Sequence, residues 1–501
     1  MAIKEASYNQ IFKATSLFGG VKVLTIFISI IRSKFIAVLL GPSGIGIVGL
    51  LNSTISFIAI LTNFGLERST VKNIAAANAS KDFHRIGEVV SVLRLLVWVT
   101  GLLGMFVTII LSSFLSELTF GNKDYTIAFI CLSITLFLNQ ISAGQGVVLR
   151  GLSQLTYMAK SSLFGAISGL LISVPIYYLW GLDGIVPAII LSSIATLTLT
   201  YYYSRKVSIN IIEMSKAVFI TESKDMIRMG LVLSLSSLVV LGESYIVRVF
   251  IRLTGSISDV GYYTAGFAIV NTYFGVIFTA LTTDYYPRLA SVAYDNKKAS
   301  LLMNQQSEMT ILILAPILVV FLVFINPIII LLYSKEFVPI NDMILWAGLG
   351  IFFKAASWSL GVIFISKGDV KTLFISELSA TLVMLILNLL GYKYFGLEGL
   401  GLSFLGAFLF AYIQTFLIVR FKYSFIYSIN FYKIFTVQLI IGTVGLIVVR
   451  CGNQIWSYLI GVVLIIISLL FSLFYLDRNT DILNSIKTKY IKDENIKKNK
   501  K

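Results

Sequence analysis

The chain alternates between long apolar stretches and short polar gaps over nearly its whole length. An α-helix needs about 20 apolar residues to cross about 30 Å of hydrocarbon, and most of the stretches reach that length. We place them at residues 14–40, 44–66, 88–111, 125–143, 161–180, 184–203, 229–251, 260–282, 309–332, 343–366, 372–392, 398–419, 434–449 and 455–476, of which 434–449 is the shortest. The pattern predicts an all-α polytopic membrane protein with about 14 transmembrane helices.

Lysine and arginine residues concentrate in every second gap between these stretches. Of the 40 in the chain, 29 lie in the gaps on one side or in the tails, 5 lie in the gaps on the other side and 6 lie within the stretches. Loops that stay in the cytoplasm retain Lys and Arg, whereas translocated loops lack them. We therefore expect a multi-pass protein with both termini in the cytoplasm.

Composition agrees with this class and argues against several others. Hydrophobic residues make up 57% of the chain and charged residues 13%, which is far from the composition of soluble domains. The net charge of +16 follows the topology rather than one basic patch, so we expect no nucleic-acid partner. Cys131 and Cys451 lie 320 residues apart, and the single His84 lies in an inside gap where we expect it to be solvated. We expect neither a metal nor a cofactor.

An internal repeat organises the stretches into two halves. Three pairs of gap motifs recur at nearly one period. Gly41–Gly46 matches Gly255–Gly261, with Gly46 and Gly261 lying 215 residues apart; Gly181–Ile185 matches Gly396–Leu400, also displaced by 215; and Arg150-Gly151 matches Lys367-Gly368, displaced by 217. One period contains six stretches, so the two copies are expected to be parallel six-helix lobes with a transport path between them.

The repeat predicts domain boundaries as well as a function class. We expect an N-lobe at 1–205, a cytoplasmic linker at 206–228, a C-lobe at 229–422, two extra spans at 423–476 and a basic cytoplasmic tail at 477–501. Such an arrangement predicts a transporter that works by alternating access.

The sequence also argues against an enzyme. No phosphate-binding lysine loop, HExxH, GxSxG or paired CxxC motif occurs in it. The longest outside gap, at about residues 112–124, is too short for a catalytic domain. A polysaccharide polymerase is the alternative from a different class. Without an ATP site, an ion gradient, the membrane potential or a metabolic sink would supply the energy.

The cations within the stretches are the candidate substrate-binding residues. A cation in hydrocarbon costs about 2.5–3.5 kcal/mol on insertion scales, unless it reaches the interface or a wet cavity. Lys354 lies about 11 residues from either end of its stretch and Lys22 about 8 residues from the start of its own. Arg32 and Lys34 are also deep. We assign these four to a hydrated lumen. For Lys354 and Lys22, structural neutralisation by a partner on another span is the alternative.

The two remaining cations lie nearer the membrane surfaces. Arg94 is about 6 residues past an inside boundary and Arg248 is near an outside one. For both, a side chain that reaches the interface explains the position as well as a lumen does.

Carboxylates are rarer within the stretches. Glu243 lies 5 residues before Arg248, and Glu377 lies just inside the cytoplasmic end of its stretch. We treat both as candidate coupling or gating groups. Because cations outnumber carboxylates, the pattern favours an anionic substrate, whereas a drug or cation antiporter would need buried carboxylates.

Short motifs along the chain resemble those of a known family. In order, they are Lys34-Phe-Ile-Ala-Val-Leu-Leu-Gly41-Pro42-Ser-Gly44-Ile-Gly46, Tyr286-Pro287-Arg288-Leu289-Ala290, Ser334-Lys335-Glu336-Phe337, Lys354-Ala-Ala-Ser-Trp-Ser-Leu-Gly361, Ser366-Lys367-Gly368 and Ile375-Ser376-Glu377. Their order and spacing over about residues 8–422 are similar to those of Wzx-type O-antigen and polysaccharide flippases. These belong to the multidrug/oligosaccharidyl-lipid/polysaccharide exporter superfamily.

The resemblance implies a function in the bacterial inner membrane. The implied substrate is an oligosaccharide on undecaprenyl diphosphate, as in O-antigen, capsule or exopolysaccharide synthesis, moved from the cytoplasmic to the periplasmic leaflet. Candidate coupling ions are H⁺ and Na⁺, and implied partners are membrane lipids and polysaccharide assembly proteins.

The resemblance also implies roles for individual residues. Lys34, Arg248 and Lys354 would meet the diphosphate and acidic sugars, because the family carries charged residues at these positions, as it does at Glu377. The assignment of Lys22 and Arg32 to the lumen rests on their depth in the stretch alone.

The extra stretches at 434–476 depart from twelve-span members of the family. They are similar to those of the fourteen-span lipid II flippases. A lipid II flippase and a drug/cation antiporter of the same superfamily are therefore the alternatives.

Overall fold

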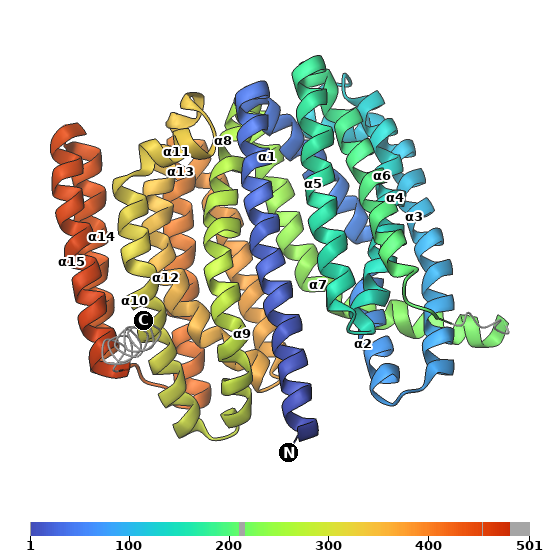
Figure 1. The fold of residues 1–501 in the computed structure, drawn as a ribbon. Coiled ribbons are helices and arrows are strands. Elements are labelled where there is room, and N and C mark those ends of the chain that lie inside the picture. The colour runs from blue at the N-terminus through green and yellow to red at the C-terminus, as the bar shows by residue number, and fades with distance from the viewer. Residues whose placement is uncertain (1, 210–215, 453, 481–501) are drawn as a thin grey trace, which may run out of the picture. The chain divides into compact units, whose positions relative to one another are not determined.

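The computed structural model describes residues 2–209, 216–452 and 454–480, which are mostly helical and contain no strand. Figure 1 shows the helices: α1 (Ala2–Thr62), α2 (Leu66–Ala79), α3 (Phe83–Phe120), α4 (Thr126–Gly151), α5 (Leu155–Trp180), η1 (Gly181–Gly184), α6 (Ile185–Ser204), α7 (Lys216–Thr254), α8 (Ile257–Phe267), the π-helix η2 (Ala268–Tyr273), α9 (Phe274–Val292), α10 (Asn296–Val323), α11 (Ile325–Leu332), η3 (Lys335–Ile340), α12 (Asn341–Ser366), α13 (Val370–Tyr423), α14 (Ile429–Cys451) and α15 (Gln454–Thr480). The chain is an all-α multi-pass membrane protein, as its hydrophobic pattern predicts.

Three of the membrane-spanning helices are long enough to cross twice. Eleven helices in the described residues are long and apolar enough to cross a membrane. Three of them, Gly20–Thr62, Leu155–Ser204 and Val370–Tyr423, measure 43, 50 and 54 residues, about twice the length that one crossing needs. Each overlaps two of the predicted stretches, so all 14 predicted stretches coincide largely with described helices; residues 63–65, near the end of the second stretch, and Phe324, within the ninth, lie outside them.

Glycines divide these long helices at corresponding positions of the repeat. Gly181 and Gly396, which are 215 residues apart, have φ of 56° and 57° and ψ of −130° and −137°. Gly41 divides α1 with a φ of 64°. A side chain with a Cβ rarely adopts positive φ, so these glycines allow the chain to turn between two spans.

Contacts across α13 show that it folds back on itself. Ser403 Oγ donates to the carbonyl oxygen of Leu387 at 2.6 Å, and Lys422 and Tyr423 at its end each reach Asp369 at its start, at 2.5 Å. A straight helix of 54 residues would separate its ends by about 80 Å. The hydrogen bonds from Lys422 and Tyr423 hold the pKa of the Asp369 carboxyl well below its usual range.

The two copies of the repeat meet at corresponding residues of α1 and α8. Ser43 Oγ lies 2.8 Å from the Oγ of Ser258, the residue 215 positions later. A Cβ added to Gly46 or to Gly261 would lie 2.1 or 1.9 Å from a backbone carbonyl of the opposite helix. Only glycine allows backbones to approach this closely, so the 215-residue spacing of the two glycines reflects a direct contact.

The contacts divide the chain into two compact units. The first contains the residues up to Phe267 together with Ile329–Pro339, and the second contains Ala268–Ile328 and the residues from Ile340 on. The boundary after Phe267 falls at the π-helix η2. The predicted lobes are defined by the repeat rather than by contacts, so their limits stay a prediction. Residues 210–215 of the predicted linker and the basic tail from residue 481 lie outside the described residues.

The last two spans are bonded to each other and to the rest of the second unit. In α14, Gln438 donates to Ser472 Oγ of α15 at 2.9 Å and accepts from Ser468 at 2.7 Å. At the end of α14, Arg450 lies 2.6 Å from the Glu398 carboxylate of α13. Buried polar bonds and an ion pair therefore fix this helix pair, which Figure 1 shows beside α10.

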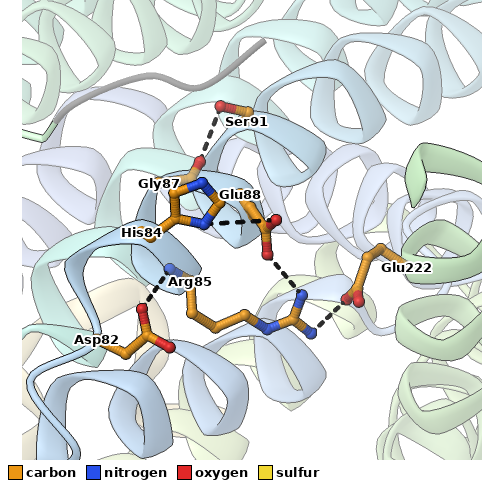
Figure 2. Close-up of polar contacts among 7 residues, drawn as sticks. All are labelled: Asp82, His84, Arg85, Gly87, Glu88, Ser91 and Glu222. Carbon is orange, nitrogen blue, oxygen red and sulfur yellow. Dashed lines mark hydrogen bonds and ion pairs between the residues drawn. The ribbon is translucent and has the colours of Figure 1, made fainter. Parts of the chain in front are cut away.

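An ion-pair cluster joins the polar ends of α3 and α7 in the first unit (Figure 2). Arg85 lies 3.1 Å from Glu88 and 2.7 Å from Glu222 of α7. Asp82 caps α3 by accepting from the backbone N–H of Arg85. The side chain of His84 is 72% exposed, with Nδ1 3.6 Å from Glu88, so this histidine is solvated as expected.

We expect Gly261→Ala to lower the stability of the protein, because its new Cβ would overlap the Pro42 carbonyl oxygen. Overpacking of this kind costs about 1–3 kcal/mol. Gly146→Ala is the matched control, since nothing lies within 4 Å of its added Cβ and the change is otherwise favourable by about 0.5–1 kcal/mol in a helix. Thermal unfolding in detergent measures both variants, and equal Tm values would contradict the close contact.

Candidate functional site

Lys354 lies near the middle of α12, where neither membrane surface is within easy reach. Its Nζ donates to Asn271 Oδ1 at 2.8 Å. Asn271 belongs to the π-helix η2, a wide helical turn that is frequent at functional sites. The ammonium group is therefore held by a neutral amide from another span.

Two aromatic rings complete the surroundings of this ammonium group. The Nζ of Lys354 lies 4.8 Å from the ring centroid of Phe408 and 5.9 Å from that of Phe278. Ring faces attract cations without neutralising them. Among the described residues, no carboxylate forms an ion pair with Lys354. The positive charge thus remains uncompensated within its unit.

A groove of about 460 Å³ adjoins this position in the second unit. It is lined by Phe278, Thr279, Thr282, Thr283, Tyr286 and Pro287 of α9 and by Trp358 of α12. Trp358 follows Lys354 by one helical turn. The ring centroid of Phe278 lies 5.5 Å from that of Trp358, so one phenylalanine links the groove to the cation.

A second cavity of the same unit, of about 660 Å³, contains more charged groups. It lies between α9, α10 and the start of α14. Its carboxylates have partners: Asp284 lies 2.6 Å from Arg288, and Glu308 accepts from Ser428 Oγ at 2.5 Å. Within the described ranges, no three His, Cys, Asp or Glu side chains come together as metal ligands would.

Arg248 is buried within the first unit, with 7% of its surface exposed. Its guanidinium donates to the Ser244 carbonyl oxygen at 2.8 Å and to Thr264 Oγ1 at 3.4 Å, and its carbon Cζ lies 5.4 Å from each of the Tyr263 and Phe267 ring centroids. This side chain is enclosed by α7 and α8 rather than extended to the membrane surface.

Glu243, which is 7% exposed, lies near enough to Arg248 for their charges to attract. The structure therefore brings together these two predicted residues, one carboxylate and one cation.

Lys34 has a specific backbone partner. Its Nζ donates to the carbonyl oxygen of Ile330 at 2.6 Å, in the last turn of α11. The last four carbonyls of a helix lack an intrahelical donor, and a cation also interacts favourably with this end of the helix dipole. The contact gives Lys34 a capping role that its position in the sequence does not reveal.

The other predicted residues lie apart from one another. Arg32 lies beside Gly169 and Tyr177 of α5, and its Nε is buried without a hydrogen-bond partner. Lys22 is exposed on α1, and Glu377 is half-buried on α13. Lys354 and Glu377 belong to the second unit and the others to the first.

Sequence reasoning missed the neutral members of the site. Asn271 is an amide in an apolar stretch, and the hydrophobic pattern contains no signal for the π-helix that presents it. Trp358 lies in the motif from Lys354 to Gly361, but that motif assigned no role to it. Trp358 follows Lys354 by four residues, and this spacing places the two side chains on the same face of a helix.

The chain is similar to one protein family and to several solved transporters. A family model described as a polysaccharide biosynthesis protein matches residues 35–342. An inward-facing multidrug resistance MATE family transporter of the MOP superfamily shares 18% identity over 80% of this chain and 94% of its own, with a TM-score of 0.66. The lipid II flippase MurJ, in an inward closed conformation, shares 15% identity over 92% of this chain and 99% of its own, with a TM-score of 0.69.

A third similar structure is a MOP superfamily transporter from Pyrococcus furiosus. Its binding pocket is described as having reverse polarity, which suggests a different function for that protein. It shares 15% identity over 83% of this chain and 95% of its own, with a TM-score of 0.58. At these identities the likeness concerns the fold. Comparison with curated protein sequences finds no significant match.

We expect Lys34→Met to destabilise the protein by about 1–3 kcal/mol, because it leaves the Ile330 carbonyl without its donor. Lys22→Met, a change of the same type at an exposed position of the same helix, should have little effect on stability. Thermal unfolding in detergent compares the two variants. A Tm of Lys34→Met equal to that of the wild type would contradict the capping role.

Proposed function

The chain belongs to the polysaccharide biosynthesis protein family, and from this membership we propose that it is a flippase for lipid-linked oligosaccharides. The substrate is an oligosaccharide repeat unit on undecaprenyl diphosphate. Transport by alternating access carries it from the cytoplasmic to the periplasmic leaflet of a bacterial inner membrane. Both termini then lie in the cytoplasm, in agreement with the distribution of Lys and Arg.

The observation that carries the substrate class is the uncompensated charge of Lys354. A lysine at this depth costs several kcal/mol unless an anion, water or dipoles surround it. Asn271 supplies a dipole and two aromatic rings supply quadrupoles, but none of them supplies negative charge. A diphosphate supplies that charge, and its attraction is stronger in a site shielded from water.

The other predicted cations rank lower as diphosphate ligands. Lys34 already donates to a backbone carbonyl and Arg248 is enclosed beside Glu243. Arg32 retains a buried N–H without a partner, which makes it the next candidate after Lys354. Lys22, on an exposed part of α1, would act earlier, by attracting the anionic substrate to the protein.

A drug or cation antiporter is the rival within the same fold. Such a protein needs a carboxylate free to exchange a cation for H⁺ or Na⁺. Glu243 lies within range of the positive charge of Arg248, which disfavours the binding of a second cation there. Glu377 is the better candidate for coupling in either function, because no ion pair joins it to another described residue.

A lipid II flippase is a second candidate, favoured by the two helices α14 and α15. The MurJ structure, which is covered over 99% of its length, has the same overall fold. Lipid II and oligosaccharide carriers share the undecaprenyl diphosphate anchor, so the role proposed for Lys354 applies to both. Polysaccharide assembly proteins and membrane lipids are the expected partners.

We expect Asn271→Asp to reduce glycan export at least about tenfold, an effect of roughly 1.4 kcal/mol on the transport barrier. The new carboxylate would sit 2.8 Å from the ammonium group and neutralise it while preserving its shape and position. Lys354→Met should cause a similar loss. Surface polysaccharide per molecule of membrane-inserted protein is the measurement.

Lys354→Arg serves as the charge-conserving control for this experiment. It should retain more export than Lys354→Met, because a guanidinium also attracts a diphosphate. Normal export by both Asn271→Asp and Lys354→Met would contradict a substrate-binding role for this cation.

Replacing the two carboxylates distinguishes the flippase from the antiporter. Glu243→Gln and Glu377→Gln each remove one negative charge at nearly constant volume. For a flippase of anionic substrates we expect at most a severalfold loss with Glu377→Gln, through coupling, and little loss with Glu243→Gln. Drug efflux from cells that express the protein, abolished by either change, would favour the antiporter instead.

A further inference from the structure

The groove beside Lys354 has a row of three threonines on one face of α9. Thr279, Thr282 and Thr283 line it together with Tyr286, and Trp358 of α12 forms the opposite part of the lining. The hydroxyl oxygens and the aromatic rings give this wall both polar and apolar surface. The composition therefore indicates a ligand with both polar and apolar faces.

The hydrogen bonds of these threonines define what the groove can bind. Each hydroxyl donates to the carbonyl one turn earlier: Thr279 to Gly275 at 2.9 Å, Thr282 to Phe278 at 2.7 Å and Thr283 to Thr279 at 3.1 Å. Once its proton is donated, a hydroxyl oxygen retains lone pairs that accept hydrogen bonds. The threonine row thus offers acceptors to a ligand rich in O–H donors.

Trp358 supplies the complementary apolar surface. Its ring packs against Phe278 and Tyr285, with centroids 5.5 and 5.9 Å apart, and these contacts fix its orientation. A rigid aromatic side chain offers a large contact area at a low entropic cost. A pyranose ring presents C–H groups on its faces and hydroxyls at its edge, which matches an aromatic ring beside hydroxyl acceptors.

The groove and the cation are spaced for two adjacent parts of one ligand. Trp358 lies one helical turn, about 5.4 Å, from Lys354 along α12, and Phe278 contacts both side chains. In a lipid-linked glycan the first sugar is bonded directly to the diphosphate. A phosphate held at Lys354 therefore brings that first sugar within reach of Trp358.

We propose that this groove, formed by Thr279, Thr282, Thr283, Tyr286 and Trp358, is the subsite for the first pyranose of the transported glycan. The proposal rests on the flippase function proposed above and assigns its sugar contacts to the second unit alone. The groove runs along α9 from Phe278, which contacts Lys354, to Pro287, beside Arg288, and this end of α9 is on the predicted cytoplasmic side. The sugar then enters from the leaflet in which it is synthesised.

The test compares two probes with the full chain in nanodiscs. One probe is undecaprenyl diphosphate, and the other is undecaprenyl diphosphate carrying N-acetylglucosamine. We expect the wild type to bind both, the second more tightly. We expect the double variant Thr282→Val/Thr283→Val to bind the sugar-bearing probe about tenfold more weakly than the wild type does. The single variant Trp358→Leu should show the same loss. Neither variant should change the affinity for the sugar-free probe. Lys354→Met should weaken both.

Matched controls keep the test independent of folding. Thr282→Ser retains the hydroxyl acceptor. Thr198→Val removes a hydroxyl from an exposed position of α6, where it donates to the Ile194 carbonyl oxygen one turn earlier, at 2.9 Å. Both should bind as the wild type does. A loss with Trp358→Leu that Trp358→Phe restores would identify the aromatic ring as the cause.

The outcomes separate the subsite from the function on which it rests. Equal wild-type affinity for the two probes, or equal weakening of both by the groove variants, overturns the sugar subsite and leaves the flippase standing. The sugar subsite is also overturned if the groove variants change only how much bilayer lipid the protein retains, because the groove then binds an acyl chain. Failure of the wild type to bind either probe overturns the proposed function itself.

Discussion

A charge inside a membrane must be surrounded by polar atoms of the protein, because hydrocarbon offers none. The cations of this chain meet that requirement in different ways. Lys34 donates to an end carbonyl of α11, and Arg248 is enclosed by hydroxyls, a carbonyl and two rings. Lys354 meets one amide oxygen and no counter-charge. This difference separates cations that stabilise helix contacts from one that can bind an anion.

Close backbone contacts provide the frame that holds these charges. Gly46 and Gly261 allow α1 and α8 to touch at corresponding positions of the repeat, and the left-handed Gly181 and Gly396 turn each copy at the same point. The π-helix η2 has no counterpart among the predicted features. It widens the span between α8 and α9 and carries the asparagine that holds Lys354. The two units that the contacts define also meet along the chain at this element.

Much of the fold could be predicted because its signals are local. The stretch 434–449, the weakest of the predicted spans, lies within α14, and the glycine pairs marked the turns. The structure also confirms a solvated His84. Of the residues around Lys354, the sequence singled out only the lysine itself as a candidate site residue. Depth and the family resemblance assigned Lys34 to the lumen, and its partner, 296 residues away, was beyond any local pattern.

The sequence by itself determined which segments form long apolar helices, where the chain turns and which charges lie within those helices, because hydrophobicity and glycine placement act over a few neighbouring residues. Only the tertiary structure decided which of those charges are already satisfied. The partner of Lys354 lies 83 residues away on another span, and the packing of helices determines which side chains face one another. The same packing set Trp358 and the threonines of α9 around one groove.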